Sequence, residues 1–455
     1  MTTSSDPSDG LAGLAELLRQ DPAPEAPSPT ERDSDEVRRR RRRRRIGLII
    51  TAIVLVVLIA VPAGYAAWAL TAPLASPIET SQAPRVPPGE PVALRLPSEG
   101  ASAISVAGAD EYLGPDAAGI WASSGGDEAR PIASISKLIT ALVVLDAKPL
   151  AGVDDPGPTI TFSEADHDLY DTYYVQGATI AAMPAGSSMS LHDALATMLI
   201  PSASNYAEAV STWAFGSQRA FLNATRRWLE ANGLTGTTIV EPTGISPRNM
   251  STPADLLAIG KLAAANPVIA QIVATRSLWL PVPGPMANTN TLLGIDGVTG
   301  LKTGNLGEGS HNLVYTATFE VGAAEPLRVT GVVLGGFSRD TVNTSVVALL
   351  DSIRSGFHDI PVATAGRDVG EYSTPWGSTA KIVLAEDASI FTWSDTPIVV
   401  TMETLPPETY RDGEVVGSIT WTAGPQSTTV PLEIEGSIED PEPWWRLTNP
   451  GELGR

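Results

Sequence analysis

The longest uncharged segment of the chain sets the first limit on its fold. Ile46 to Leu70 (IGLIITAIVLVVLIAVPAGYAAWAL) contains no charged side chain, and an α-helix of that length crosses a hydrocarbon layer about 30 Å thick. Eight consecutive arginines, Arg38 to Arg45, precede it. The positive-inside rule therefore predicts a cytoplasmic N-terminal tail, one membrane-spanning helix and an extracytoplasmic body.

The same segment has an alternative interpretation as a cleaved signal peptide. Ala67-Trp68-Ala69 resembles the small-x-small pattern of a processing site. The apolar region of a signal peptide is, however, only about 7–15 residues long. The length therefore favours a retained single-pass anchor in the cell membrane.

Charge is distributed unevenly on the two sides of this segment. The net charge is −21; residues 1–45 contain ten arginines against nine acidic residues, and residues 71–455 contain 20 basic against 42 acidic residues. So acidic a body would repel phosphate backbones, and nucleic acid is not expected as a partner. The chain also lacks cysteine and any His-x-x-x-His pattern, and we expect neither a metal nor another cofactor.

Changes of composition mark further boundaries. Residues 1–37 are rich in Pro, Ser and acidic residues, which is typical of disorder. Within them, LAGLAELLR at 11–19 predicts either a docking helix for a cytoplasmic partner or a transient helix. Seven prolines in residues 71–97 predict a stiff spacer.

The next region has the pattern of an α/β domain. ASAISVAG and AAGIWASS predict a strand pair, helical patterns follow, and strands return at HNLVYTATFEV and LRVTGVVLGG. Two segments of one sheet thus bracket a helical lobe. Short strand patterns separated by turn residues then predict a small all-β domain. The predicted segments are a disordered tail at 1–45, a membrane helix at 46–70, a proline-rich linker at 71–98, the α/β domain at 99–360, the β-rich domain at 361–440 and a tail at 441–455.

A lysine begins one of the predicted helices in an unusual setting. Ser134 and Lys137 open the apolar pattern LITALVVLDA, one helical turn apart, so their side chains can meet. A lysine held away from water has a lowered pKa and can take a proton from a neighbouring hydroxyl. The pattern predicts Ser134 as a nucleophile and Lys137 as its base. An N-cap serine followed by a lysine that reaches solvent is the alternative.

Two later segments extend this candidate site. GLKTGN carries Lys302-Thr303-Gly304 before a strand; a leucine separates Gly300 from the lysine, so the Gly-Lys-Thr end of a P-loop is missing. Between the two lysine motifs lies MLIPSASNYAEAV, a helix–loop–helix pattern. Its loop offers Ser202, Ser204 and Asn205.

The order of these motifs resembles a known family. Ser-x-x-Lys, a serine-containing loop and Lys-Thr-Gly are the motifs of penicillin-binding proteins and class A β-lactamases. The flanks IASISKLITALVVLD, EPTGISPRNMSTPADLLAIGK and TNTLLGIDGVTGLKTG look most like the type-5 low-molecular-mass penicillin-binding proteins, the serine D-alanyl-D-alanine carboxypeptidases of peptidase family S11. The resemblance covers about residues 100–360. It implies a β-lactamase/transpeptidase-like α/β domain followed by the family's small all-β domain.

The resemblance also implies a substrate and a set of roles. Ser134 would be acylated by a peptidoglycan stem peptide ending in D-Ala-D-Ala, or by a β-lactam, with Lys137 as general base. Ser202 would relay the proton to the leaving D-alanine, and water would then hydrolyse the acyl-enzyme. The implied substrate-binding groups are Ser204, Lys302, Thr303, Gly304 and Asn305, with the backbone N–H groups of Ser134 and Asn305 as the oxyanion hole.

Two positions depart from the family pattern. The register places Ser204, rather than Asn205, at the family's asparagine position, and a hydroxyl has one donor where an amide has two. Val342 stands where the family's carboxylate-binding arginine is expected. Arg339, three residues earlier, is either its substitute or an ordinary surface charge.

The sequence therefore predicts a penicillin-sensitive, membrane-anchored DD-carboxypeptidase. The two departures suggest one alternative, a catalytically weakened scaffold that binds penicillin or peptidoglycan. A class A β-lactamase is a further alternative. That class requires a Glu-x-x-x-Asn segment, and Glu241 and Asn249 in EPTGISPRN have the wrong separation.

Overall fold

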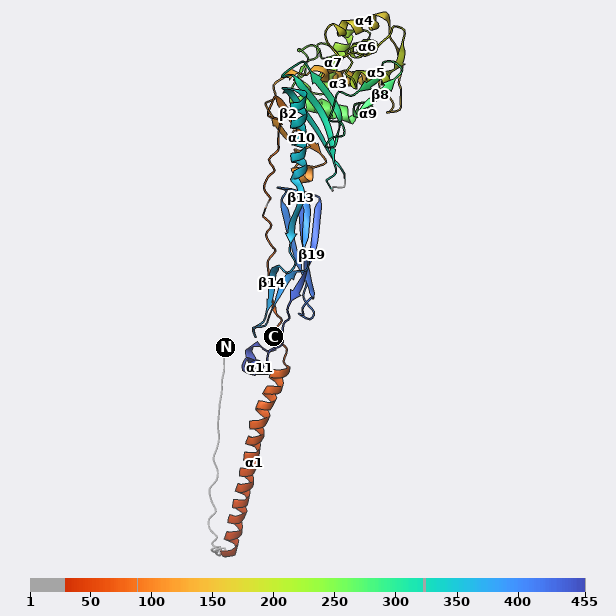
Figure 1. Ribbon diagram of the computed structural model, residues 1–455. Helices are drawn as coiled ribbons and strands as arrows, with labels where there is room; N and C mark the ends of the chain where they lie inside the picture. Colours follow the sequence, from red (N-terminus) through yellow and green to blue (C-terminus); the bar gives the residue numbers. More distant parts are fainter. Residues whose placement is uncertain (1–28, 88, 322–324, 455) are drawn as a thin grey trace, which may run out of the picture. The chain divides into compact units, whose positions relative to one another are not determined.

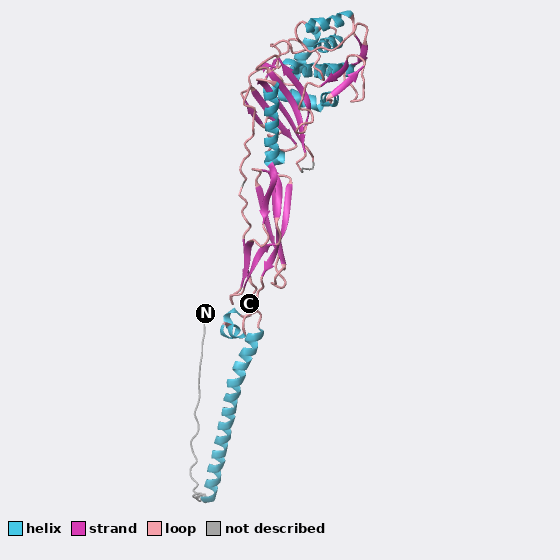
Figure 2. Cartoon of the chain, viewed as in Figure 1, coloured by secondary structure: helices cyan, strands magenta, loops and turns pink. Residues whose placement is uncertain are grey.

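The computed structural model describes residues 29–87, 89–321 and 325–454; Figures 1 and 2 show the chain by position and by secondary structure. The helix predicted at 11–19 lies outside these residues. Contacts divide the chain into two units. One unit contains the segment up to Pro77 together with 374–378 and the C-terminal segment from Glu439; the other contains 78–373 and 379–438.

In the first unit, helix α1 (Pro29–Thr71) contains the predicted membrane span. Its part Glu36–Thr71 is long and apolar enough to cross a membrane, with a mean hydropathy of 3.0 over 18 residues. The helix begins well before Ile46, so the prediction of a disordered tail is wrong for residues 29–45. Arginine is a strong helix former, and acidic residues favour a helix N-terminus.

The C-terminal segment, which composition predicted as a tail, folds against the end of α1. Helix α11 (Pro443–Thr448) lies there. Tyr65 Oη donates to the Leu447 carbonyl at 2.7 Å. Arg446 Nη1 donates to the Ala72 carbonyl at 2.9 Å, which satisfies an acceptor that the end of a helix leaves unpaired.

In the second unit, a five-stranded antiparallel sheet forms the centre of the α/β domain, in the order β10-β11-β12-β2-β3. The strand patterns from the beginning and the end of the domain therefore meet in one sheet, as predicted. Its strands are β2 (Ala101–Ala107), β3 (Ala122–Ser124), β10 (Val298–Asn305), β11 (His311–Phe319) and β12 (Leu327–Gly336).

Two hydrophobic cores cover the two faces of this sheet. On β11, Val314 packs with the helical lobe, whereas Leu313 and Tyr315 pack with α10 (Arg339–Gly356). Alternating contacts of this kind follow from the two-residue period of a strand. The helices of the lobe are α3 (Ser136–Ala147), α4 (Glu164–Tyr174), α5 (Leu191–Leu199), α6 (Ser204–Phe215), α7 (Gln218–Ala231), α8 (Pro253–Ala265) and α9 (Pro267–Ala274).

Short elements complete the second unit's α/β domain and the first unit's C-terminal segment. In the α/β domain they are α2 (Asp110–Leu113), η1 (Ala133–Ile135), β4 (Arg130–Pro131), β5 (Thr159–Thr161), β6 (Ser188–Ser190), β7 (Met250–Ser251), β8 (Ser277–Leu280) and β9 (Gly284–Ala287). In the C-terminal segment, the 3₁₀ turn η2 (Pro450–Glu452) follows α11.

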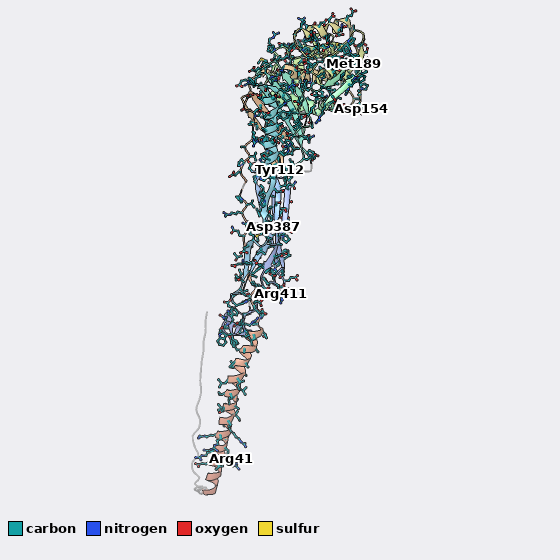
Figure 3. All side chains as sticks on the ribbon, in the orientation of Figure 1. Arg41, Tyr112, Asp154, Met189, Asp387 and Arg411 are labelled. Atoms are coloured by element: carbon teal, nitrogen blue, oxygen red, sulfur yellow. The ribbon has the colours of Figure 1, made fainter. Side chains whose placement is uncertain are left out.

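An all-β region follows α10, which confirms the predicted fold class. A six-stranded antiparallel sheet, β1-β14-β15-β19-β18-β17, and the pair β13-β16 share one core around the fully buried Trp421; Figure 3 draws the side chains. Strand β1 (Ile78–Ser81) comes from the predicted linker and pairs with β14, so that linker is more than a spacer. The other strands are β13 (Phe357–Ala363), β14 (Asp368–Ser373), β15 (Thr379–Leu384), β16 (Ala388–Trp393), β17 (Ile398–Thr404), β18 (Val415–Ala423) and β19 (Gln426–Glu435).

The packing of α10 on the sheet gives a test of the fold. Leu350 is fully buried there, and replacing such a leucine with alanine costs about 2–5 kcal/mol because contacts are lost and a cavity remains. We expect Leu350→Ala to lower the urea midpoint measured by tryptophan fluorescence. The exposed Thr344 lies on the same helix, and Thr344→Ala should change stability by less than about 0.5 kcal/mol. Equal losses for both variants would contradict this packing.

Candidate active site

Ser134 lies in the 3₁₀ turn η1, immediately before α3. The Ser136 hydroxyl donates to the Ala133 carbonyl at 2.8 Å and fixes this turn. One turn later, Lys137 is fully buried. Its Nζ donates to Ser134 Oγ at 3.0 Å and to the Thr243 carbonyl at 2.7 Å. The serine and the lysine are thus in direct contact.

Burial changes the proton affinity of Lys137. Desolvation lowers its pKa from 10.5 to about 7, although the nearby Glu241 carboxylate acts in the opposite direction. Near neutral pH, much of the amine is therefore unprotonated and able to accept the proton of Ser134. The alternative of a lysine that reaches solvent is wrong, because no part of this side chain is exposed.

Glu241 is a fixed anion beside this lysine. Its carboxylate accepts hydrogen bonds from the backbone N–H groups of Thr243 and Gly244, both at 2.7 Å, and from Asn249 Nδ2 at 3.0 Å. Asn249 also donates to the Ser136 hydroxyl at 2.9 Å. A carboxylate bonded in this way is a fixed negative charge that raises the pKa of Lys137. It is not free to activate a water molecule.

Strand β10 brings the Lys-Thr-Gly motif next to the turn of the serine. At Gly304 a Cβ atom would lie 2.6 Å from the Ile132 carbonyl oxygen and 3.0 Å from Ala133 Cβ. Contacts that short do not occur between real side chains and backbone, so the strand approaches the turn only because residue 304 is glycine. The third residue of the motif therefore sets the distance between the strand and Ser134.

Of the other two residues of the motif, Thr303 lines the site cavity, and Lys302 lies close enough to Lys137 and Arg339 for their charges to act on it. Lys302 is almost fully buried, and its pKa is lowered by desolvation and further by the positive charges of Lys137 and Arg339. Thr303 Oγ1 lies 2.7 Å from Thr289 Oγ1. The site thus combines two buried amines with a pair of hydroxyl groups.

The loop between α5 and α6 and the first residue of α6 supply two further hydroxyls. Ser202 has a φ of 72°, a conformation uncommon for a residue with a side chain, and its buried Oγ has no hydrogen-bond partner among the described residues. Ser204 lines the same cavity as Ser134. Asn205 does not line it: its side chain bonds the backbone N–H and carbonyl of Ala181 at 3.1 and 2.8 Å.

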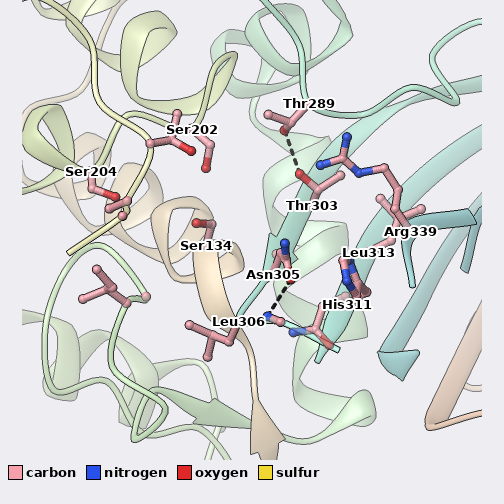
Figure 4. Close-up of a pocket in the computed structure, with 18 of the residues that line it drawn as sticks. Ser134, Ser202, Ser204, Thr289, Thr303, Asn305, Leu306, His311, Leu313 and Arg339 are labelled. Carbon is pink, nitrogen blue, oxygen red and sulfur yellow. Dashed lines mark hydrogen bonds between the residues drawn. The ribbon is translucent and has the colours of Figure 1, made fainter. Parts of the chain in front are cut away.

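Ser134, Ser202, Ser204 and Thr303 line one cavity of about 420 Å³ (Figure 4). Ser202 and Ser204 enter it from one side, Thr303 and Arg339 from the opposite side, and Ser134 lies between them. Arg339 is the first residue of α10 and forms no ion pair with any carboxylate of the described chain. No carboxylate is among the described residues that line the cavity.

Sequence motifs did not identify several lining residues. His311 lies opposite Asn305 in the β10–β11 register, so a hairpin prediction after the Lys-Thr-Gly motif would have placed it near the site. The remainder come from loops or from a helix face without a motif of their own. They include Gln176, Gly177, Ala178, Thr179, Thr289 and Asn343.

Comparisons with known proteins agree with this geometry. Residues 115–338 match the family model of D-alanyl-D-alanine carboxypeptidases, peptidase S11. The D-alanyl-D-alanine endopeptidase of Escherichia coli is 32% identical over 195 residues, covering 41% of this chain and 59% of that relative. The D-alanyl-D-alanine carboxypeptidase DacF of Bacillus subtilis is 25% identical over 274 residues, covering 57% of this chain and 66% of that protein.

A solved structure supports the fold. Penicillin binding protein 6B from Escherichia coli aligns with a TM-score of 0.51 and 18% identity, covering 78% of this chain and 99% of that structure. The chain spans less than two thirds of the length of the Escherichia coli endopeptidase. The match places residues 115–338 of this chain in the peptidase S11 family, the D-alanyl-D-alanine carboxypeptidases.

Proposed function

We propose that this protein is a serine DD-carboxypeptidase that removes the terminal D-alanine from peptidoglycan stem peptides. The observation that carries the proposal is the contact between the fully buried Lys137 amine and Ser134 Oγ, 3.0 Å apart, at the wall of an anion-favouring cavity. Membership of the S11 family supports the same substrate class.

In acylation, Ser134 Oγ attacks the carbonyl carbon of the penultimate D-alanine while Lys137 takes the hydroxyl proton. Backbone N–H groups of Ser134 and Asn305 stabilise the oxyanion; a lost donor of this kind costs about 10²–10³ in rate. The peptide C–N bond then breaks, and the leaving amine receives the proton from Lys137 through Ser202. The buried, unpartnered Oγ of Ser202 supports this relay.

In deacylation, water attacks the ester carbon and Lys137 takes its proton. The ester bond breaks, and Ser134 Oγ regains a proton from the lysine. Nucleophile, base and oxyanion donors are all protein groups in this cycle.

Arg339 and the Lys-Thr-Gly motif bind the free carboxylate of the substrate. Arg339 replaces the arginine that the family pattern places at position 342, because both positions face the cavity one helical turn apart. Its guanidinium lies towards Thr303 and Thr289 (Figure 4). Without an acidic partner of its own, it is available to a carboxylate.

Ser204 and Gly304 position the substrate between the two walls, and β-lactams acylate the same serine. The shorter side chain at 204 favours one alternative, a scaffold that binds penicillin but turns over slowly. A class A β-lactamase is disfavoured because the Glu241 carboxylate is already held by four N–H groups. The relative named as an endopeptidase favours a second alternative, cleavage of cross-links.

The chain is anchored in the cell membrane by α1. Glu36–Thr71 is long and apolar enough for one crossing. The arginine run at its N-terminal end supports a cytoplasmic N-terminus and an extracytoplasmic catalytic domain. In that location the enzyme meets peptidoglycan.

The first test is mass spectrometry of the full-length protein after separate incubation with benzylpenicillin and with a pentapeptide ending in D-Ala-D-Ala. We expect a penicilloyl adduct on Ser134 and release of D-alanine. Ser134→Ala should abolish the adduct and lower the release by roughly 10⁴–10⁶-fold. An adduct without release would favour the scaffold, and the absence of both would refute the proposed mechanism.

The lysine pKa gives a second test. Only the neutral amine of Lys137 accepts the serine proton, so the acylation rate should rise with pH through the pKa of about 7. With such a pKa, the rate at pH 6 should be about tenfold below the plateau. Glu241→Gln removes the charge that raises this pKa, and its profile should move to lower pH. A stopped-flow profile that is flat across this range would exclude Lys137 as the base.

Carboxylate recognition gives a third test. Arg339→Gln removes a charged hydrogen bond worth about 1.5–3 kcal/mol, so kcat/KM for the pentapeptide should fall roughly 10–100-fold. Acylation by a thioester without a carboxylate should be unaffected. Arg367, an exposed arginine of the all-β region, provides the matched control Arg367→Gln. Equal effects on both substrates would show that Arg339 acts on structure rather than on the carboxylate.

A further inference from the structure

A second cavity, of about 370 Å³, shares no lining residue with the active site. It lies at the corner where α8 and α9 meet at a bend of 96°, over the beginning of β10. Its volume falls within the range of about 300–1,000 Å³ that is usual for small-molecule sites. The peptidase chemistry proposed above does not use it.

Small and aliphatic residues make the helix side of the cavity wall. From the helices come the alanines of the corner, and from the sheet comes Leu301. Ala317 and Val329 also border the cavity, but their side chains pack in the core on the opposite face of the sheet. Alanine side chains leave space that larger residues would fill. The cavity therefore exists because the residues at this corner are alanines. The alanines of the two helices are Ala264, Ala265, Ala270 and Ala274.

Two cations lie among these apolar residues. Lys261 Nζ donates to the carbonyls of Ala118 and Gly119 at 2.6 and 3.1 Å, which hold the ammonium but do not neutralise it. Arg328 is exposed and has neither an ion pair nor a side-chain hydrogen bond to any described residue. In a chain with 51 acidic and 30 basic residues, two such cations at one cavity favour an anion.

Hydroxyl groups of the sheet also line this cavity. Thr330 is one of them and is 8% exposed. The others are Ser105, Thr299, Thr316 and Thr318. Hydroxyl groups can donate hydrogen bonds to the acceptor atoms of an anionic head group.

We propose that this cavity binds a single-chain anionic amphiphile. The alkyl chain packs against the corner alanines and Leu301, and the anionic head group lies within reach of Lys261 and Arg328. The cavity takes a carboxylate or a phosphate head by the same chemistry. The proposal does not depend on the peptidase activity, because no residue is shared between the two sites.

The test is photolabelling of the full-length protein in lipid nanodiscs with octanoate that carries a diazirine on its chain. Peptide mapping should find labels on α9 and on the beginning of β10. Labels on α1 report the probe that is dissolved in the bilayer, and they serve as the internal reference. Unlabelled octanoate and octyl phosphate are the two competitors, and the better of them identifies the head group as carboxylate or phosphate.

Two variants make the test specific. Ala270→Leu fills the cavity and Arg328→Gln removes a charge; each should lower the ratio of cavity to α1 labelling about tenfold, as expected for a lost charged contact or a filled site. Arg367→Gln, which changes an exposed arginine of the all-β region, should leave the ratio unchanged. Unchanged ratios in the first two variants, equal labelling by a trimethylammonium analogue, or no label at the cavity would each overturn the proposal.

Discussion

The removal of one amine from water is the constraint on which the candidate active site depends. A buried ammonium without an ion pair is costly, so burial shifts Lys137 towards its neutral form. The apolar side chains of α3 exclude solvent, and Glu241 restores part of the proton affinity without forming a direct bond to the amine. The balance between desolvation and this fixed charge gives a pKa of about 7, which suits a base near neutral pH.

The remaining elements of the fold place the other residues of the site around that amine. The sheet joins strands from both ends of the α/β domain, and the helical lobe between them contributes Ser202 and Ser204. Close approach is possible where side chains are absent, as at Gly304 beside Ile132. The first turn of α10 contributes Arg339 to the cavity wall, so the sheet, the helical lobe and α10 all contribute residues to one cavity.

Local patterns predicted those parts of the molecule whose physical cause is local. The spacing of Ser134 and Lys137 on a helix and the alternation in β11 could both be read from the sequence, because each depends on residues a few positions apart. The pairing of β1 with β14 could not, since it joins residues almost 300 positions apart and β1 itself has only four residues. For the same reason no pattern placed Gln176 or Thr289 in the cavity. The sequence does not predict the helical conformation of residues 29–45, because the Pro, Ser and acidic residues of the tail are typical of disorder. The helix propensity of the arginines is the signal that favours the observed helix.

The meeting of the C-terminal segment with the end of α1 has a topological consequence. Leu74 and Leu453 form an isolated β-bridge, and Gly454 N donates to the Pro73 carbonyl at 2.9 Å. The part of the chain between Leu74 and Leu453 therefore begins and ends at neighbouring positions. Adjacent ends are the geometry that allows a module to be inserted into another chain or to be circularly permuted. Two backbone segments therefore connect the small structure at the end of α1 to the rest of the chain, although only one of them continues directly from α1.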